Sequence, residues 1–287
     1  MKQFGTARVE VRPSRSILSP ATGFIRAYDF TLNPYRGCQY GCSYCYAAAF
    51  SPNEKMRQDW GNWAIVKENA AELLEKELKR WYKKRDRPPR IYMSSVTDPY
   101  QPLETQQRLT RQLLEIMLPF KPCLVIQTRS PMILRDVDLL QRFRHLRINM
   151  SIPTGSDRVR RDFEPRSPSI AARLQTVAKL RQTIDPDKGY RPKLSITITP
   201  LLPILPEDCD RFVERLQVAA LLFLPLFVLC PHFSFVSAIR SWVFSSPPLF
   251  FFFFVNFQQS YQQFKEILYR QLHHLELREG QAGFGYE

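Results

Sequence analysis

The chain has 287 residues, of which 44% are apolar and 24% are charged, so it can bury a sizeable core and is not expected to be disordered. Its 41 lysines and arginines outnumber its 27 aspartates and glutamates, giving a formal net charge of +14, which favours polyanionic partners such as nucleic acid or anionic cofactors. The first twenty residues lack a continuous apolar run, so a secretory signal and disulfides are not expected; we expect a cytoplasmic protein, with an organelle as the alternative.

Short apolar runs alternate with helical patterns over residues 28–216, which predicts repeated βα units. The first expected strand, 29–33, leads directly into a loop that contains three cysteines. Five such units predict an α/β fold with a parallel sheet that curls into a full or partial barrel. The later expected elements are a helix at 70–84, a strand at 90–96, a helix at 104–118, a strand at 123–127, a helix at 136–144, a strand at 146–152, a helix capped by Ser167 with Pro168 at its first position and ending near 181, a strand at 193–198 and a helix at 207–216.

Polar residues follow the carboxyl ends of the expected strands, which is where sites lie in barrels of this kind. We therefore expect these residues to meet at one rim. They are the cysteine loop after the first strand, Thr97 and Asp98 after the second, Thr128 and Arg129 after the third, Ser151 at the end of the fourth, and Thr199 and Pro200 after the fifth.

The βα pattern stops after residue 216. Residues 217–257 hold one charged residue, Arg240, and 11 of the 21 phenylalanines. Three interpretations stay open: a translated intron, because runs of Phe codons are pyrimidine-rich; a buried or interfacial segment; and, least favoured because four prolines interrupt it, a membrane segment. The expected organisation is an N-terminal extension (1–27), a core (28–216), an anomalous apolar Phe-rich segment (217–257), and a C-terminal helix and tail (258–287).

The loop NPYRGCQYGCSYCYA (33–47) places Cys38, Cys42 and Cys45 in a C-x3-C-x2-C spacing without a fourth cysteine or a histidine nearby. A structural zinc site needs four ligands, usually as two close pairs. Thiolates on one compact loop suit a cubane iron-sulfur cluster, which normally takes four cysteines. Three cysteines would leave one iron open to a small molecule. A structural zinc site or a stray thiol cluster is the alternative.

This spacing, with the aromatic Tyr44 before the last cysteine, resembles the signature of the radical S-adenosylmethionine (SAM) superfamily. The resemblance implies a partial (β/α)6 barrel that holds a 4Fe-4S cluster, with SAM on the open iron. It also implies that a one-electron reductant such as ferredoxin or flavodoxin drives cleavage of SAM to a 5'-deoxyadenosyl radical, which abstracts hydrogen from the substrate. In such enzymes the cofactor carries the difficult chemistry and the protein holds and tunes it.

Residues 15–216 are similar, more closely, to spore photoproduct lyase and its DNA repair photolyase relatives. The motifs that carry the likeness are the cysteine loop, TDPYQPLE (97–104), DFEPRSP (162–168) and TPLLP (199–203). We expect Asp98 to orient the SAM amine or a loop backbone, and Arg166 to contact an anionic cofactor or substrate, or to pair with Glu164. The likeness implies that five further side chains surround SAM: Tyr44, Thr97, Arg129, Ser151 and Thr199.

Two positions depart from the lyase. Arg129 stands where the lyase has a lysine. The positive charge is kept, but a planar guanidinium replaces the compact ammonium group. Ser95 stands where the lyase has its hydrogen-donating cysteine, and a serine O–H is a far poorer hydrogen-atom donor than a thiol. The catalytic residue that would return hydrogen is therefore unknown, unless Cys123 or Cys209 takes this role. We expect a radical SAM enzyme whose substrate is unidentified, with a nucleic acid lesion as the leading candidate. The alternative is a non-enzymatic, metal-dependent nucleic-acid-binding module.

A basic stretch, KRWYKKRDRPPR (79–90), interleaves cations with aromatic residues at the end of an expected helix. Such a stretch could follow phosphates and stack bases. Cations at this position also complement the helix dipole, which is the interpretation we favour. His145, beside Arg144 and Arg147, is expected at a solvated helix end.

Overall fold

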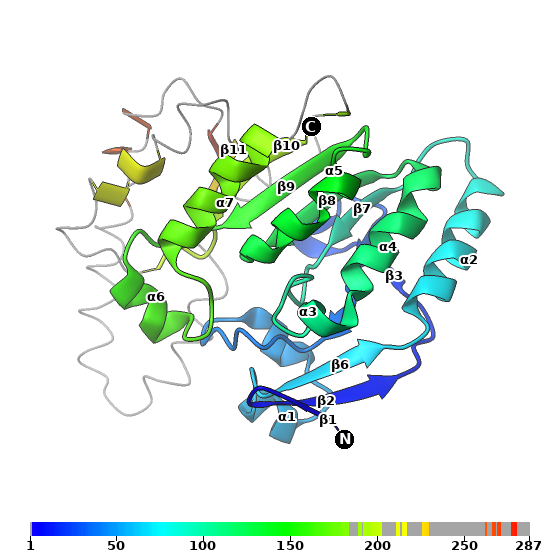
Figure 1. Ribbon diagram of the computed structural model, residues 1–287, viewed down its shortest axis with the longest axis horizontal. Helices are drawn as coiled ribbons and strands as arrows, with labels where there is room; N and C mark the ends of the chain where they lie inside the picture. Colours follow the sequence, from blue (N-terminus) through cyan, green and yellow to red (C-terminus); the bar gives the residue numbers. More distant parts are fainter. Residues whose placement is uncertain are drawn as a thin grey trace.

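The computed structural model describes residues 2–183, 189–190, 192–202, 211–212, 214–216, 226–229, 262, 266–267, 269–270 and 277–279. At its centre lies one eight-stranded sheet, in the order β12-β11-β10-β9-β8-β7-β4-β3 (Figure 1). All neighbouring pairs from β12 to β4 are parallel, and β3 is antiparallel to β4 at the edge. The strands are β3 Leu18–Pro20, β4 Phe30–Leu32, β7 Arg90–Met93, β8 Cys123–Thr128, β9 Leu146–Ser151, β10 Lys193–Ile198, β11 Leu226–Leu229 and β12 Leu277–Glu279.

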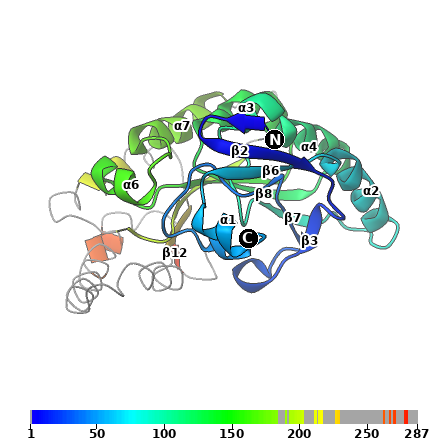
Figure 2. The ribbon, with the colours of Figure 1, turned by 90° about the horizontal axis from the view of Figure 1, so that it is seen from below.

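Helices connect the parallel strands and arch over one face of the sheet (Figure 2). Parallel neighbours require such crossover connections, and right-handed crossovers place the helices on the same side. The expected α/β fold with a partial barrel of parallel strands is confirmed. The described residues form seven mutually parallel strands, one more than the expected (β/α)6 arrangement has. The helices are α1 Glu54–Gln58, α2 Ala70–Tyr82, α3 Glu104–Gln107, α4 Leu109–Met117, α5 Val137–Leu140, α6 Asp157–Phe163 and α7 Ile170–Thr183.

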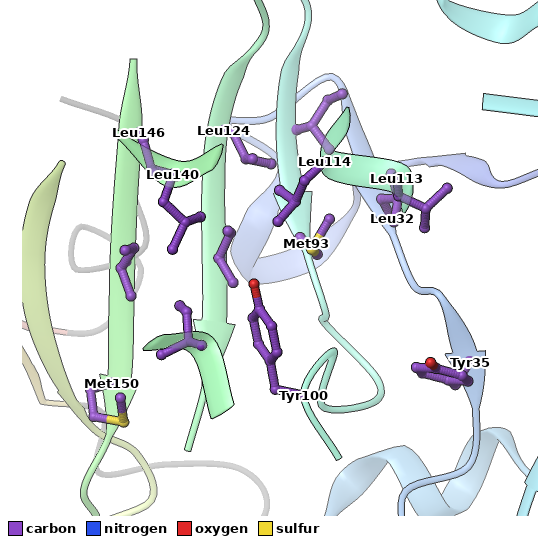
Figure 3. Packing of buried hydrophobic residues seen from close by; sticks show 14 of the residues in the cluster. Leu32, Tyr35, Met93, Tyr100, Leu113, Leu114, Leu124, Leu140, Leu146 and Met150 are labelled. Carbon is purple, nitrogen blue, oxygen red and sulfur yellow. The ribbon is translucent and has the colours of Figure 1, made fainter. Parts of the chain in front are cut away.

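The main core lies between the sheet and these helices (Figure 3). In β8, Leu124 and Ile126 belong to this core, whereas Val125 packs with Tyr28 and Tyr92 in a separate cluster. Successive strand side chains point to opposite faces, so a strand with apolar residues at every position is buried on both. The sheet that carries the site is therefore covered on both faces at β8.

A second, four-stranded sheet joins the N-terminus to a segment beyond the cysteine loop, in the order β1-β2-β6-β5. Its strands are β1 Lys2–Phe4, β2 Ala7–Arg12, β5 Tyr35–Arg36 and β6 Trp63–Lys67. The sequence prediction placed residues 1–27 in an extension and expected no strand at 63–67, so this sheet was not foreseen. It matters for the site because β5 follows β4 after only two residues and leads directly into the cysteines.

Two expected helices are shorter than predicted. The helix expected at 104–118 breaks at Arg108, whose φ of 50° is left-handed. The carboxylate of Glu104 there accepts the backbone N–H of Thr110 at 3.0 Å, which fixes the break. The helix expected at 136–144 is α5 alone, preceded by a 3-10 segment at Pro131–Asp136.

The expected cap of α7 is wrong by two residues. The helix begins at Ile170, and the Oγ atom of Ser169 accepts the N–H of Ala172 at 3.1 Å. Ser167 lies in the preceding loop, where its carbonyl accepts a hydrogen bond of 2.9 Å from Arg160. The strand expected at 90–96 likewise ends early, because the residue after β7 takes a φ of 74°.

The sixth parallel strand, β11, comes from the Phe-rich segment. The rest of residues 217–257 lies outside the described residues, as do Cys209, Cys230 and most of the tail. In the helix expected at 207–216, the described residues 211–212 and 214–216 are helical. No helix in the described part of the chain is both long and apolar enough to span a bilayer.

Candidate radical SAM site

The cysteine loop is a pair of tight turns after β5. The N–H of Gly41 bonds to the carbonyl of Cys38 at 3.3 Å, and the N–H of Cys45 bonds to that of Cys42 at 3.2 Å. Gly37 opens the loop with a φ of +83°, and a Cβ atom there would lie 2.6 Å from the Trp63 ring. Only glycine fits such a left-handed position against a packed ring.

The three thiols share one apolar cluster, and none is in a disulfide. Cys38 and Cys42 are buried, at 8% and 5% exposure, and Cys45 is partly buried. Burial raises the pKa of the Cys42 thiol to about 12, and it also raises the pKa of the other two thiols. Thiolates here therefore need a cationic group to stabilise them.

The loop is fastened to residues 97–104 by side-chain amides and a hydroxyl. Thr97 donates its hydroxyl to the carbonyl of Gly37 at 2.7 Å, and Gln101 donates to the same carbonyl at 3.3 Å. The side-chain oxygen of Gln39 accepts the backbone N–H of Leu103 at 2.6 Å. The backbone N–H of Gln39 donates to the side-chain oxygen of Gln101 at 3.0 Å. The TDPYQPLE motif thus holds the cysteine loop in place, and Thr97 takes part in this.

Asp98 is buried beneath the rim and joins the ends of β7 and β8. Its carboxylate accepts the N–H of Tyr100 and the N–H of Arg129, both at 2.9 Å, and the hydroxyl of Thr128 at 2.7 Å. Burial raises its pKa, although these hydrogen bonds and the charge of Arg129 oppose the rise. Of the two roles expected for Asp98, these contacts are those of a backbone-orienting residue; contact with SAM stays a prediction.

A buried ionic network stands behind the last two cysteines. The Nη1 atom of Arg129 lies 2.8 Å from the Cys42 sulfur and 3.2 Å from the Tyr44 hydroxyl. Arg129 pairs with Glu164, whose other oxygen pairs with Arg173; the side chains of Glu164 and Arg173 are both 0% exposed. Tyr44 donates its hydroxyl to Glu164. Arg129 therefore places a cation beside the Cys42 thiol, and Glu164 fixes its position.

Glu164 keeps its charge inside the protein. Burial alone would raise its pKa, but the two guanidinium groups and the Tyr44 hydroxyl bring that pKa below its usual value. The expected pairing of Glu164 with Arg166 is wrong. Arg166 instead donates to the carbonyl of Gly61 and, at 2.6 Å, to the side-chain oxygen of Asn62. No sequence pattern pointed to Arg173, which is 44 residues from Arg129 and lies within α7.

Two of the expected SAM ligands lie on strands further along the sheet. Ser151 is buried as the last residue of β9, and its carbonyl accepts a hydrogen bond of 3.0 Å from Arg173. Thr199 follows β10 and precedes a cis peptide bond to Pro200. Both occupy the expected carboxyl rim, and their contact with SAM stays a prediction.

Ser95 lies on the same rim. Its hydroxyl accepts a hydrogen bond of 3.3 Å from Asn33, and its carbonyl accepts the hydroxyl of Tyr46. Cys123, offered as a substitute donor, is the first residue of the six-residue strand β8, whose length puts it about 20 Å from the rim. That distance excludes Cys123 as a direct hydrogen donor there.

The donor set fits an iron-sulfur cluster. No group of three or more His, Cys, Asp or Glu side chains among the described residues surrounds a single metal position. A cubane places each thiolate on a different iron, so it does not require the sulfurs to converge on one point. Three free thiols in one cluster, one of them in contact with the Arg129 guanidinium, match that need better than they match a four-ligand zinc site.

The comparison with protein families agrees with this chemistry. The model of the Radical SAM superfamily matches residues 32–216, which is more than half of the chain. The chain therefore belongs to the Radical SAM superfamily. Membership implies an iron-sulfur cluster and SAM as cofactors.

Curated relatives resemble the chain over part of their length. An uncharacterized protein of Methanocaldococcus jannaschii is 36% identical over 152 residues, covering 53% of this chain and 54% of that protein. An uncharacterized protein of Mycobacterium tuberculosis is 26% identical over 204 residues, covering 67% and 56%. The radical SAM Nalpha-GlyT isomerase of Pseudomonas phage M6 is 28% identical over 187 residues, covering 64% and 36%. The chain thus spans about half the length of the first two relatives.

Solved structures share the fold. Spore photoproduct lyase complexed with dinucleoside spore photoproduct superposes with a TM-score of 0.56 at 17% identity, covering 78% of this chain and 62% of the lyase chain. A mutant of that lyase with bound AdoMet and dinucleoside spore photoproduct gives a TM-score of 0.55 at 17% identity, covering 77% and 61%. The expected likeness to the lyase therefore holds at the level of the fold.

Proposed function

We propose that Cys38, Cys42 and Cys45 hold a 4Fe-4S cluster whose fourth iron is left to SAM, and that the enzyme cleaves SAM reductively to begin hydrogen abstraction from a nucleic acid lesion. The observation that carries the proposal is the gathering of three unbridged thiols in one apolar cluster, with the Arg129 guanidinium 2.8 Å from the sulfur of Cys42. When bound, the cluster and SAM supply one-electron chemistry and the radical that removes the hydrogen.

The residues around the loop would prepare this site. Arg129 offsets the negative charge of the thiolates, and Glu164 with Arg173 keeps it in position. Val159 and Leu202 are buried in the thiol cluster and would keep water away from a reactive intermediate. The proposed contacts with SAM come from side chains of the rim: Tyr44, Thr97, Asp98, Arg129, Ser151, Arg166 and Thr199.

Two observations support a nucleic acid substrate. The chain has a formal net charge of +14, and solved structures with the same fold hold a dinucleoside spore photoproduct. The electron would come from a small redox protein such as ferredoxin or flavodoxin. Because Ser95 replaces a thiol, we propose a reaction that does not return hydrogen from a cysteine at this position.

Anaerobic reconstitution tests the cluster and the cleavage of SAM. The protein should bind iron and sulfide, and with dithionite it should convert SAM to 5'-deoxyadenosine. Cys38→Ser, Cys42→Ser and Cys45→Ser should each lose bound iron and at least a hundredfold of this activity. Cys123→Ser is the matched control and should retain both, because Cys123 lies at the far end of β8. A reconstituted protein that holds no iron, or that holds it equally without Cys42, would refute the proposal.

The substrate is tested separately with dinucleoside spore photoproduct as the probe. Conversion should be slow with Ser95 in place and should increase in Ser95→Cys, which provides a thiol at the rim. If Ser95→Cys cleaves SAM normally but leaves the dinucleoside unchanged, this lesion is not the substrate, while the proposed cofactor chemistry stands.

A further inference from the structure

A second site lies at the amino ends of the strands, on the edge of the sheet opposite the cysteines. A pocket of about 420 Å³ opens there, formed by the segments that lead into β7, β8 and β9. The strands between the two edges have up to six residues, so the pocket and the rim are about 20 Å apart. Pro88 and Pro119 form part of its wall.

Two aromatic rings form the apolar side of the pocket. The rings of Tyr82 and Phe120 have centroids 6.1 Å apart and an interplanar angle of 30°. The Tyr82 hydroxyl donates to the carbonyl of Phe120, which ties the end of α2 to the segment before β8. Tyr82 is still 37% exposed. Such a surface can stack against a planar ring.

Three cationic or titratable side chains form the polar side: Lys121, Arg144 and His145. All three are exposed, and no carboxylate of the described residues pairs with any of them. Lys121 has a left-handed backbone, with φ 46° and ψ 47°. It caps the 3-10 segment Leu118–Phe120, and its backbone N–H bonds to the carbonyl of Leu118, so this conformation is an ordinary helix ending that holds Lys121 at the pocket. These groups leave positive charge beside the aromatic wall unneutralised.

The basic stretch 79–90 continues this surface. Lys83, Lys84 and Arg85 are exposed just beyond the end of α2, and no carboxylate of the described residues pairs with them. The Arg85 guanidinium lies over the Trp81 ring, 4.1 Å from its centroid. Arg87 does not add to the surface charge, because Asp29 holds it through two hydrogen bonds of 2.6 and 2.7 Å. Three consecutive cations without carboxylate partners among the described residues are more than the helix dipole requires. The helix-dipole interpretation therefore accounts for only part of this basic stretch.

We propose that this pocket binds one nucleotide unit, with the base against Tyr82 and Phe120 and the phosphate beside Lys121, Arg144 and His145. The unit is either a free nucleoside monophosphate or one residue of a single strand whose neighbouring phosphates lie along Lys83 to Arg85. The volume lies in the range of small-molecule pockets, roughly 300–1,000 Å³. The site does not use the cysteine loop, so it would bind whether or not the proposed cluster chemistry is correct.

Fluorescence anisotropy with the full chain tests this site. A fluorescein-labelled twelve-residue oligothymidylate and, separately, fluorescein-labelled AMP are titrated with protein, and unlabelled AMP or inorganic phosphate is added as a competitor. The double variant Lys121→Glu/Arg144→Glu should weaken binding at least tenfold and lower its salt dependence, because phosphate contacts release counterions. Lys76→Glu changes an exposed lysine on α2 that no carboxylate of the described residues pairs with; it is the matched control and should weaken binding less than twofold.

A ring variant separates stacking from charge. Tyr82→Leu should reduce competition by AMP about tenfold while leaving competition by phosphate unchanged. Binding of the oligonucleotide identifies a strand as the ligand, and binding of AMP without the oligonucleotide identifies a free nucleotide; both support the site. Binding of neither probe, or an equal loss in Lys76→Glu, overturns it. Melting temperature and SAM cleavage should be unchanged in the double variant, which separates this result from failure of the proposed function.

Discussion

The two edges of the central sheet use arginine and lysine in opposite ways. At the carboxyl edge, Arg129 and Arg173 are buried and share one carboxylate, Glu164. At the amino edge, Lys121 and Arg144 stand in solvent without a carboxylate partner among the described residues. The two edges therefore contribute differently to the electrostatic field of the protein. The buried arginines of the carboxyl edge are neutralised by Glu164, whereas the exposed cations of the amino edge are left to attract an anion.

The same contrast decides which charges stabilise the fold. Removing one partner of a buried pair leaves an uncompensated charge and costs about 3–5 kcal/mol. An exposed ion pair contributes only about 0–1 kcal/mol. Substitutions at the two edges should therefore differ several-fold in their effect on the free energy of unfolding.

Glu164→Gln should have the largest effect. It leaves two arginines, one of them fully buried, with a neutral partner, and should lower the free energy of unfolding by about 3 kcal/mol. Urea denaturation of the metal-free protein measures this. Asp138→Asn, which removes the 56% exposed partner of Arg111, is the control and should cost less than about 1 kcal/mol. Equal losses in the two variants would contradict the contrast.

Asp98→Asn should have an intermediate effect. The amide can still accept the N–H of Arg129 and donate to Thr128, but it cannot also accept the N–H of Tyr100. One buried donor is left without a partner, at a cost of about 1–2 kcal/mol in the same denaturation experiment. Asp162→Asn, at an exposed position on α6, should be neutral. An unchanged midpoint for Asp98→Asn would show that the rim loops are held by other contacts.

Arg144→Gln should have the smallest effect on stability, within about 0.5 kcal/mol of the unchanged protein. Its side chain has no partner to lose among the described residues. The expected signature is a pair of results: unchanged melting in calorimetry, together with weaker nucleotide binding. A loss of stability comparable to that of Glu164→Gln would show that the amino edge is structural.

The repeating part of the fold could be predicted from the sequence because its signals are local. Apolar runs marked β4, β7, β8, β9 and β10 to within a few residues. The second sheet was missed although ARVEVR in β2 alternates clearly, because its partner β6 lies about fifty residues later and is nearly all apolar. The break at Arg108 was missed because the bond that fixes it, from the N–H of Thr110 to the carboxylate of Glu104, leaves no mark in the helical spacing of the apolar residues.

The candidate site divides in the same way. The spacing of Cys38, Cys42 and Cys45 is a local pattern, and it led to a family that the comparison bears out. The ion pair of Arg129 with Glu164 depends on how α6 and α7 pack, which no local pattern reveals. The arginine nearest to Glu164 in sequence, Arg166, bonds to Asn62 instead. A carboxylate flanked by apolar residues in DFEPRSP was the one hint that Glu164 is buried.

The cysteine loop is suspended between the two sheets, since β4 belongs to one and β5 to the other with only residues 33–34 between them. Strand β2, near the start of the chain, holds β6, and β6 in turn holds β5. A chain shortened by its first dozen residues would lose the strand that supports β6, and so weaken one of the supports of the cysteine loop, even though no residue removed comes from the motif itself.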